Sequence, residues 1–134
     1  MLNLQKTNYA EAAEAGYEFE LKKPGSGEGT GAFIKVRGDQ SKIVRAWSRR
    51  KATEFQMKTL KSKDKDKPMS MDEVEDFGVE QAINRIISWR GISDDGVNEI
   101  PFTVENAERL LKDHPWILEQ VVEEAKELLN FLPE

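Results

Sequence analysis

The segment between Tyr17 and Val36 constrains the fold most, because its alternating pattern requires extended strands. Tyr17, Phe19 and Leu21 alternate with charged residues, as a strand with one buried face requires. A loop rich in glycine follows, and the sequence AFIKVRG then resumes the alternation. Two strands separated by a Gly-rich loop predict an N-terminal β-hairpin over residues 17–37.

The loop KKPGSGEGTG has a second interpretation, because glycine amides at a helix start can wrap a phosphate group. Phosphate-binding loops of that kind end in Gly-Lys-Ser or Gly-Lys-Thr and lead into a helix. This loop lacks that ending and leads into a strand. The pattern therefore favours a flexible hairpin tip, and we expect no cofactor.

A helix over residues 70–90 is predicted as the centre of the fold. Ser70 and Glu73 have the spacing of a capping box, in which each side chain bonds the backbone amide of the other residue. The apolar residues that follow cover a wider arc than the stripe of a surface helix, so this helix should be the most deeply buried one. Gly91 is expected to end it.

Three more helices complete the prediction. Thr103 and Pro115 indicate helix starts, because threonine can accept a free amide and proline lacks the amide that the first turn leaves unbonded. We therefore expect an α+β fold that is mostly helical, an N-terminal β-hairpin followed by about four α-helices, in a single domain at 17–134. The other predicted segments are a mobile N-terminal stretch at 1–16, helices at about 41–60, 103–113 and 115–130, and an exposed linker at 61–69.

Charge is distributed unevenly along the chain. Residues 42–67 carry ten basic and three acidic side chains, whereas residues 69–134 carry five basic and sixteen acidic ones. A basic stretch that also contains Trp47 and Phe55 could follow a phosphate backbone. The acidic C-terminal half would repel nucleic acid or neutralise the basic helix, so the pattern favours charge matching between protein surfaces over nucleic-acid binding.

The sequence offers little for catalysis or metal binding. It contains no cysteine, which excludes disulfides, thiolate nucleophiles and thiolate-bound zinc. His114 is the only histidine, and its place between an aspartate and a proline is typical of a helix cap. The acidic residues at 94–99 lack the spacing of a calcium loop. We therefore expect no catalytic, cofactor-binding or metal-binding residue and no enzymatic activity.

Targeting signals are also missing from the sequence. The N-terminal stretch MLNLQKTNYAEAAEAG has neither the basic nor the apolar region of a secretory signal. No apolar run approaches the roughly 18 residues of a membrane span. We expect the protein to stay in the cytoplasm in which it is made and to bind no membrane.

Several motifs together resemble the tail assembly chaperones of long-tailed bacteriophages. The resemblance covers about residues 16–132, and it is carried by the hairpin GYEFELKKP...GAFIKVRGDQ, by ISWRGI, and above all by DDGVNEIPFTVENAERLLKDHPWILEQVVEEAKELLNFL. The most specific parts are ISWRGI, the IPFTVENAERLL run and the ending HPWI...NFL. An ordinary amphipathic helix pattern does not account for these motifs when they occur together.

The resemblance implies a non-catalytic assembly factor. Such a protein coats the long, apolar tape measure protein in the host cytoplasm, keeps it soluble, helps recruit tail tube subunits and is not expected in the mature virion. Proteins of this kind are often made in two lengths by ribosomal frameshifting, and the ending NFLPE matches the short, non-frameshifted form. Two other classes remain open: a minor structural component of the tail, and a small nucleic-acid-binding regulator that uses the basic stretch at 42–67.

The last predicted helix carries two apolar faces, of which one can pack on the domain. The second face would then be left for a partner or for self-association of the chain. Our hypothesis is that this second face and the end of the chain bind the client protein. The predicted client-binding residues are Leu118, Val122, Leu129, Phe131 and Leu132.

Overall fold

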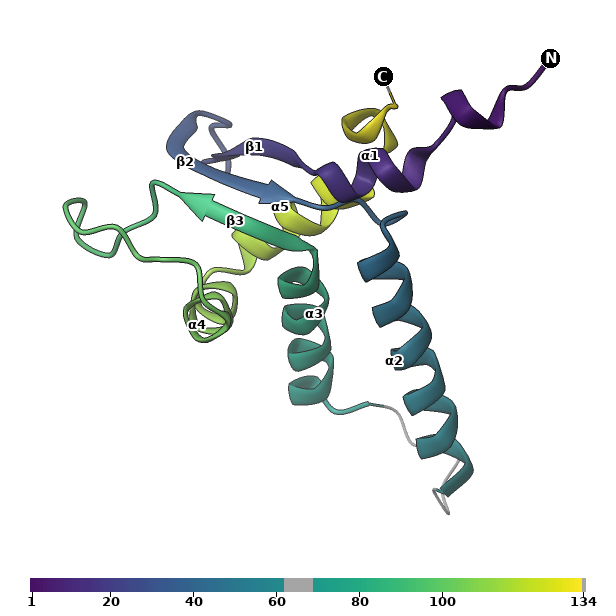
Figure 1. Ribbon diagram of the computed structural model, residues 1–134. Helices are drawn as coiled ribbons and strands as arrows, with labels where there is room; N and C mark the ends of the chain where they lie inside the picture. The colour runs from purple at the N-terminus through teal and green to yellow at the C-terminus, as the bar shows by residue number, and fades with distance from the viewer. Residues whose placement is uncertain (62–68, 134) are drawn as a thin grey trace.

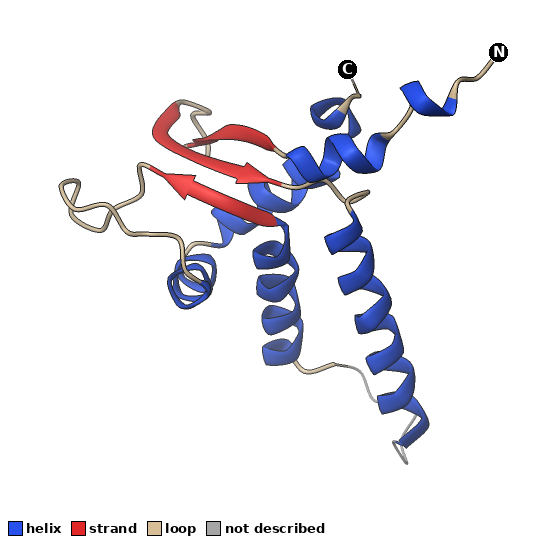
Figure 2. Ribbon diagram, viewed as in Figure 1, coloured by secondary structure: helices blue, strands red, loops and turns tan. Residues whose placement is uncertain are grey.

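A computed structural model describes residues 1–61 and 69–133 of the 134-residue chain (Figure 1). Within these residues, the fold contains five α-helices, two short 3-10 helices and one antiparallel sheet of three strands, and helices dominate (Figure 2). In chain order the elements are η1 (Leu4–Lys6), α1 (Tyr9–Ala15), β1 (Tyr17–Lys22), β2 (Gly29–Val36), α2 (Lys42–Lys61), α3 (Met71–Arg85), β3 (Ile86–Arg90), α4 (Val104–Asp113), α5 (Pro115–Lys126) and η2 (Leu128–Phe131).

The sheet has the strand order β1-β2-β3, with β2 in the centre. β1 and β2 form the predicted hairpin, in which Tyr17 lies opposite Val36. β3 then adds to the free edge of β2, with Trp89 opposite Ile34. The alternating residues of these strands point into the core, where Ile34 and Val36 are fully buried and Trp89 is 9% exposed.

The predicted fold of a hairpin followed by four helices is wrong, because a third strand and an additional helix are present. The helix predicted over 70–90 ends at Arg85, and its last five residues form β3 instead. The additional helix is α1, at the start of the chain. The strands therefore come from two separate parts of the sequence, and the wide apolar arc was the sum of a helix and a strand.

The physical reason for the strand lies in the sequence Ile-Ile-Ser-Trp and in the position of β2. Isoleucine and tryptophan fit the pleated, half-buried surface of a sheet, and Ile86 already has extended angles of φ −80° and ψ 130°. Without β3, one edge of the central strand would have no backbone partner. Long-range pairing to β2 therefore overrides the helical tendency of the preceding segment.

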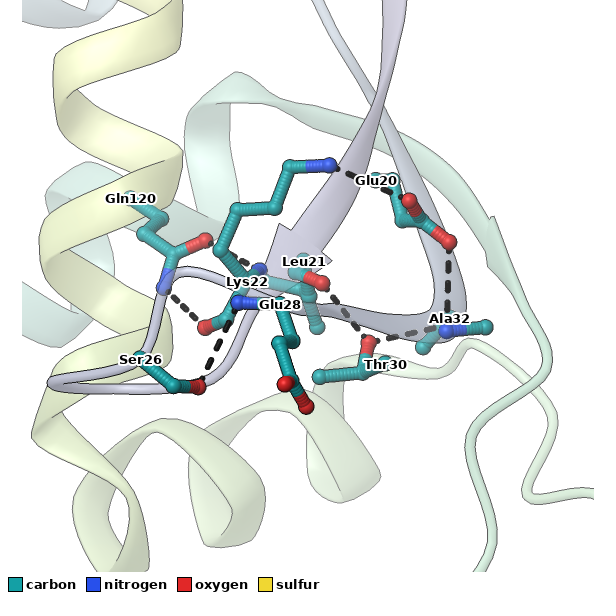
Figure 3. Close-up of polar contacts among 9 residues, drawn as sticks. Glu20, Leu21, Lys22, Ser26, Glu28, Thr30, Ala32 and Gln120 are labelled. Carbon is teal, nitrogen blue, oxygen red and sulfur yellow. Dashed lines mark hydrogen bonds and ion pairs between the residues drawn. The ribbon is translucent and has the colours of Figure 1, made fainter.

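Helix α5 covers one face of the sheet and closes the core (Figure 1). Ile117, Val121 and Ala125 lie on its buried side. Gln120 of α5 also bonds the end of β1, because its amide nitrogen donates to the Lys22 carbonyl at 2.9 Å and its amide oxygen accepts from the Lys22 backbone amide at 2.9 Å (Figure 3). A side chain thus takes the place of a neighbouring strand at this edge.

The two ends of the chain pack against each other beside the sheet. Ala13 of α1 and Phe131 of η2 are both buried, and both contact the space over Gly38. A Cβ atom at Gly38 would lie 2.9 Å from the Ala13 Cβ and 3.0 Å from the Phe131 ring, so only glycine allows this approach. The mobility expected of residues 1–16 stays a prediction, although α1 contributes Ala13 to the core.

Several helix starts occur where the sequence predicts them. The Ser70 side chain accepts the Glu73 amide at 3.1 Å, and the Thr103 side chain accepts the Asn106 amide at 3.1 Å. Pro115 stands in the first turn of α5, while that helix ends at Lys126 and a 3-10 turn replaces the rest of the predicted helix. The predicted linker at 61–69 lies largely outside the described residues. Among the helices that are described, none has the length and apolar character needed to cross a bilayer.

Replacing Gly91 with alanine should destabilise the fold strongly. Gly91 follows β3 with φ +78°, and a Cβ there would lie 2.6 Å from the Gly31 carbonyl oxygen of the neighbouring strand. Gly96 is the matched control, because it has φ +80° but no atom within 4 Å of the position that a Cβ would take. Urea unfolding should show a loss of about 3 kcal/mol for Gly91→Ala and about 1 kcal/mol for Gly96→Ala. Equal losses would contradict the close packing at Gly91.

Candidate functional site

Helix α2 is long but contributes little to the core. Of its 20 residues, only Val44 and Trp47 are buried, and both lie in its first two turns. Beyond Trp47 the helix runs beside α3, away from the sheet (Figure 1). Apolar side chains remain exposed along it, including Phe55 at 60% and Leu60 at 72%. Several exposed apolar side chains on one projecting helix make this surface a candidate for contact with a partner.

A groove of about 680 Å³ lies between α2 and α3. We call it the α2–α3 groove. The rings of Trp47 and Phe77 contact each other across it, with centroids 5.6 Å apart and an angle of 37° between the planes. Further along, Phe55 and Met69 add apolar surface from the two sides. The groove is lined by Trp47, Ser48, Lys51, Ala52, Glu54, Phe55 and Lys58 from α2, by Met69 before α3, and by Glu73, Asp76, Phe77, Glu80, Gln81 and Arg85 from α3.

One end of the groove is closed by a buried arginine. Arg85 is 5% exposed, and its Nε donates to the Asp39 carboxylate at 2.8 Å. The guanidinium group also lies over the Trp47 ring, 5.5 Å from its centroid. The Trp47 indole nitrogen donates to Glu80 at 3.2 Å. These contacts fix the start of α2 and the end of α3 relative to each other.

Two ion pairs connect the helices along the groove. Lys51 lies 2.8 Å from Glu80, and Lys58 lies 3.3 Å from Glu73. The hydrogen bond to Glu80 raises the pKa of Lys51, and the hydrogen bond from Lys58 lowers the pKa of Glu73. Burial raises the pKa of Glu80, but the hydrogen bonds from Lys51 and Trp47 outweigh it and leave this pKa below its ordinary value. Such partly exposed pairs contribute little to stability and can exchange partners easily.

The predicted client-binding residues do not form one surface. Leu118 and Val122 are half-buried and pack against the core, and Phe131 is 4% exposed within it. Leu129 and Leu132 are 74% and 53% exposed. The assignment of client binding to these five residues stays a prediction, and the geometry leaves Leu129 and Leu132 as its most accessible part.

The other sequence candidates take structural positions. His114 precedes α5 and makes no capping hydrogen bond with its side chain. Asp95 accepts the amides of Asn98 and Val97 within a turn, and these bonds lower its pKa to about 2. Among residues 1–61 and 69–133, no three acidic, histidine or cysteine side chains gather as metal ligands would. The first part of the basic stretch forms α2, and its residues 62–67 lie outside the described part.

Sequence reasoning did not identify the groove as a site. The signal was present in the apolar residues of an otherwise strongly basic helix, of which Phe55 lines the groove and Met57 and Leu60 are exposed outside its lining. Their exposure could be inferred only by noticing that α2 has too few apolar residues to bury both of its ends. Phe77 belongs to the helix that was expected to be the most deeply buried one, but it is 41% exposed because α2 does not cover it fully.

Comparison with known proteins gives one family. A family model described as YdaY prophage protein matches residues 44–134. All residues that line the α2–α3 groove fall within this match. No curated protein and no solved structure shows significant similarity to the chain. The prediction of a phage protein is confirmed at this level, and the match does not extend to a tail assembly role.

Removing Asp39 should cost more stability than removing Arg85. Asp39→Asn removes the carboxylate and leaves the buried positive charge of Arg85 unpaired. Arg85→Leu leaves the Asp39 side chain unpaired, but that side chain is 42% exposed and water can hydrate it. We expect Asp39→Asn to lower the free energy of unfolding by about 2 kcal/mol, with a smaller loss for Arg85→Leu. Chemical denaturation of both variants measures this order. The reverse order would mean that the packing of Arg85 on Trp47 matters more than its ion pair.

Proposed function

Because this chain belongs to the family of YdaY prophage proteins, we propose that it is a non-catalytic phage assembly chaperone that binds an apolar helix of its client in the α2–α3 groove. The observation that carries the proposal is the groove itself. Trp47, Phe55, Met69 and Phe77 line it, and the last three are 60%, 41% and 41% exposed. An amphipathic helix laid into such a groove would cover them.

The resemblance of the sequence to tail assembly chaperones supplies the identity of the client. On this proposal the client is the tape measure protein, and the chain also helps bring tail tube subunits to it. The protein acts in the host cytoplasm and leaves before the virion is complete. Binding through apolar contacts and ion pairs needs no reactive group, so the proposed activity is assembly and not catalysis.

Methionine and aromatic side chains suit this role for a physical reason. Methionine is flexible and polarisable and therefore adapts to different apolar surfaces. Met69 lines the groove and is 41% exposed, and Met57 and Met71 are exposed on the same two helices outside its lining. A long client with many similar apolar helices requires such adaptable contacts more than it requires one exact fit.

Leu129 and Leu132 form a second candidate contact, which retains the sequence-based hypothesis for the C-terminal end. They are exposed, but they lie on the 3-10 turn η2 and directly after it. The buried Phe131 lies between them and anchors the turn to α1. This surface is smaller than the groove, so we expect it to contribute less to client binding.

A nucleic-acid-binding regulator is the alternative with a specific observation in its favour. Lys42, Arg45, Arg49 and Arg50 are all exposed on the first half of α2. Contacts to phosphates by these residues would give an affinity that falls steeply with salt concentration. The acidic helix α3 beside them opposes that interpretation. A minor tail component, the other alternative, would be retained in purified virions.

Co-expression with the tape measure protein of the same prophage tests the proposal. The wild-type chain should raise the soluble amount of the client. Phe55→Glu introduces a charge into the groove at a residue that is 60% exposed, so the fold should be retained. Losing this apolar contact should weaken binding about tenfold, and the soluble client should fall accordingly.

Two control variants locate the effect. Val97→Glu changes an 84% exposed residue in the loop after β3 and should leave the soluble amount of client unchanged. The double variant Leu129→Glu and Leu132→Glu tests the C-terminal surface and should have the weaker effect. If Phe55→Glu solubilises the client as well as the wild type does, the groove is not the client site.

A further inference from the structure

The two sides of the α2–α3 groove carry opposite charge, and we infer that the groove selects an amphipathic helix with acidic residues along one flank of its apolar stripe and basic residues along the other. This inference rests on the proposed function and specifies its partner. It concerns the same groove, but it adds a charge pattern and a binding direction that an apolar surface alone would not require.

The charge separation follows the two helices. Helix α2 contains seven basic residues and one acidic residue, and α3 contains five acidic residues and one basic residue. Where the helices line the groove, Lys51 and Lys58 come from α2, and Glu73, Asp76 and Glu80 come from α3. The basic exception on α3, Arg85, also lines the groove and already pairs with Asp39 at 2.8 Å. The acidic exception on α2, Glu54, already pairs with Lys51 at 3.2 Å. One wall is therefore mainly cationic and the other anionic.

The existing ion pairs between the walls can exchange for pairs with a bound helix. Lys58 and Glu73 have side chains that are 75% and 47% exposed, so water already screens their interaction. An acidic residue on one flank of the client would form an ion pair with Lys58, and a basic residue on the other flank would form an ion pair with Glu73. Each wall residue keeps an opposite charge as its partner, while Phe55 and Phe77 are covered by the apolar stripe.

Uniformly charged helices fit this groove poorly. A helix with two acidic flanks would place one flank against Glu73 and Glu80, and a helix with two basic flanks would place one against Lys51 and Lys58. Like charges in contact reduce affinity and exclude wrong partners. The same consideration disfavours nucleic acid, whose phosphates would meet the carboxylates of α3.

The charge pattern also sets the direction of the bound helix. Turning a helix end for end in the groove, with its apolar stripe still facing the floor, exchanges its left and right flanks. A helix with one acidic and one basic flank therefore satisfies both walls in one direction only. A peptide with the two flanks exchanged satisfies them in the opposite direction.

Four synthetic peptides test the inference on the full chain. Each peptide has about four helical turns, to match the length of α3, and the same leucine stripe. In the first peptide one flank is acidic and the other is basic. In the second peptide the acidic and basic flanks are exchanged. In the third peptide both flanks are acidic, and in the fourth both are basic. Fluorescence anisotropy at low ionic strength should show similar affinities for the first two peptides and about tenfold weaker binding of the uniformly charged ones.

Binding direction is measured by disulfide trapping, which is clean because the chain has no cysteine of its own. Ser48→Cys and Met69→Cys place a thiol at the opposite ends of the groove, and both residues are exposed. A peptide with an N-terminal cysteine should react with one variant, and the peptide with exchanged flanks should react with the other. Equal trapping of both peptides at both ends would overturn the predicted direction.

A charge reversal on the cationic wall gives the matching control. Lys58→Glu changes a 75% exposed side chain, and circular dichroism should show an unchanged fold. It should weaken binding of the peptide with one acidic and one basic flank and strengthen binding of the peptide with two basic flanks, although Lys51 remains on the cationic wall. If the two affinities do not change in these opposite directions, the inference is overturned.

The remaining outcomes separate the inference from the proposed function. If all four peptides bind equally well and Phe55→Glu abolishes their binding, the charge pattern is wrong and the apolar groove is retained. If none of them binds, the groove fails as a helix site and both proposals are lost. A dimer of the chain that forms through the groove and that the mixed peptide cannot disrupt would assign the groove to a second copy and overturn the inference.

Discussion

The pairing of Arg85 with Asp39 is the interaction on which the arrangement of this molecule depends. Arg85 is the last residue of α3 and directly precedes β3, so it lies where the helix changes into the strand. Its backbone carbonyl accepts the Arg37 amide at 2.8 Å, and its side chain reaches both Asp39 and the Trp47 ring. One residue thus connects the sheet, the start of α2 and the end of α3. A buried guanidinium requires such partners, because an unpaired charge in the core is costly.

This anchoring explains why α2 can project with so little support. Trp47 secures the helix near its start through Phe77, Glu80 and Arg85, and the remaining turns are held mainly by exposed ion pairs. Apolar side chains on those turns have no protein surface to cover them, and a helix in water would ordinarily carry polar residues there. The stable part of the fold therefore serves as a base that presents two helices with an uncovered apolar surface between them.

The sequence predicted those features that depend on local chemistry. The hairpin followed from alternation in β1 and β2, and the starts of α3 and α4 followed from Ser70 and Thr103 as capping residues. It did not reveal β3, because the residues of Ile86–Arg90 continue an apolar pattern that also suits a helix, and only the distant edge of β2 decides between the two. The α2–α3 groove was missed for a related reason: the exposure of Phe77 depends on how α2 leaves the domain, which no local pattern records.

The distribution of charge was visible in the sequence, but its meaning depends on the fold. The basic middle and acidic end of the sequence suggested charge matching between surfaces, without indicating which surfaces meet. The fold brings the two charges together by placing α2 next to α3, so that Lys51 and Lys58 face Glu80 and Glu73 across an apolar groove. Within one chain these pairs add little stability, because water screens them. In the proposed function their role is recognition, since a groove with walls of opposite charge would discriminate among apolar helices that hydrophobic contact alone would bind equally.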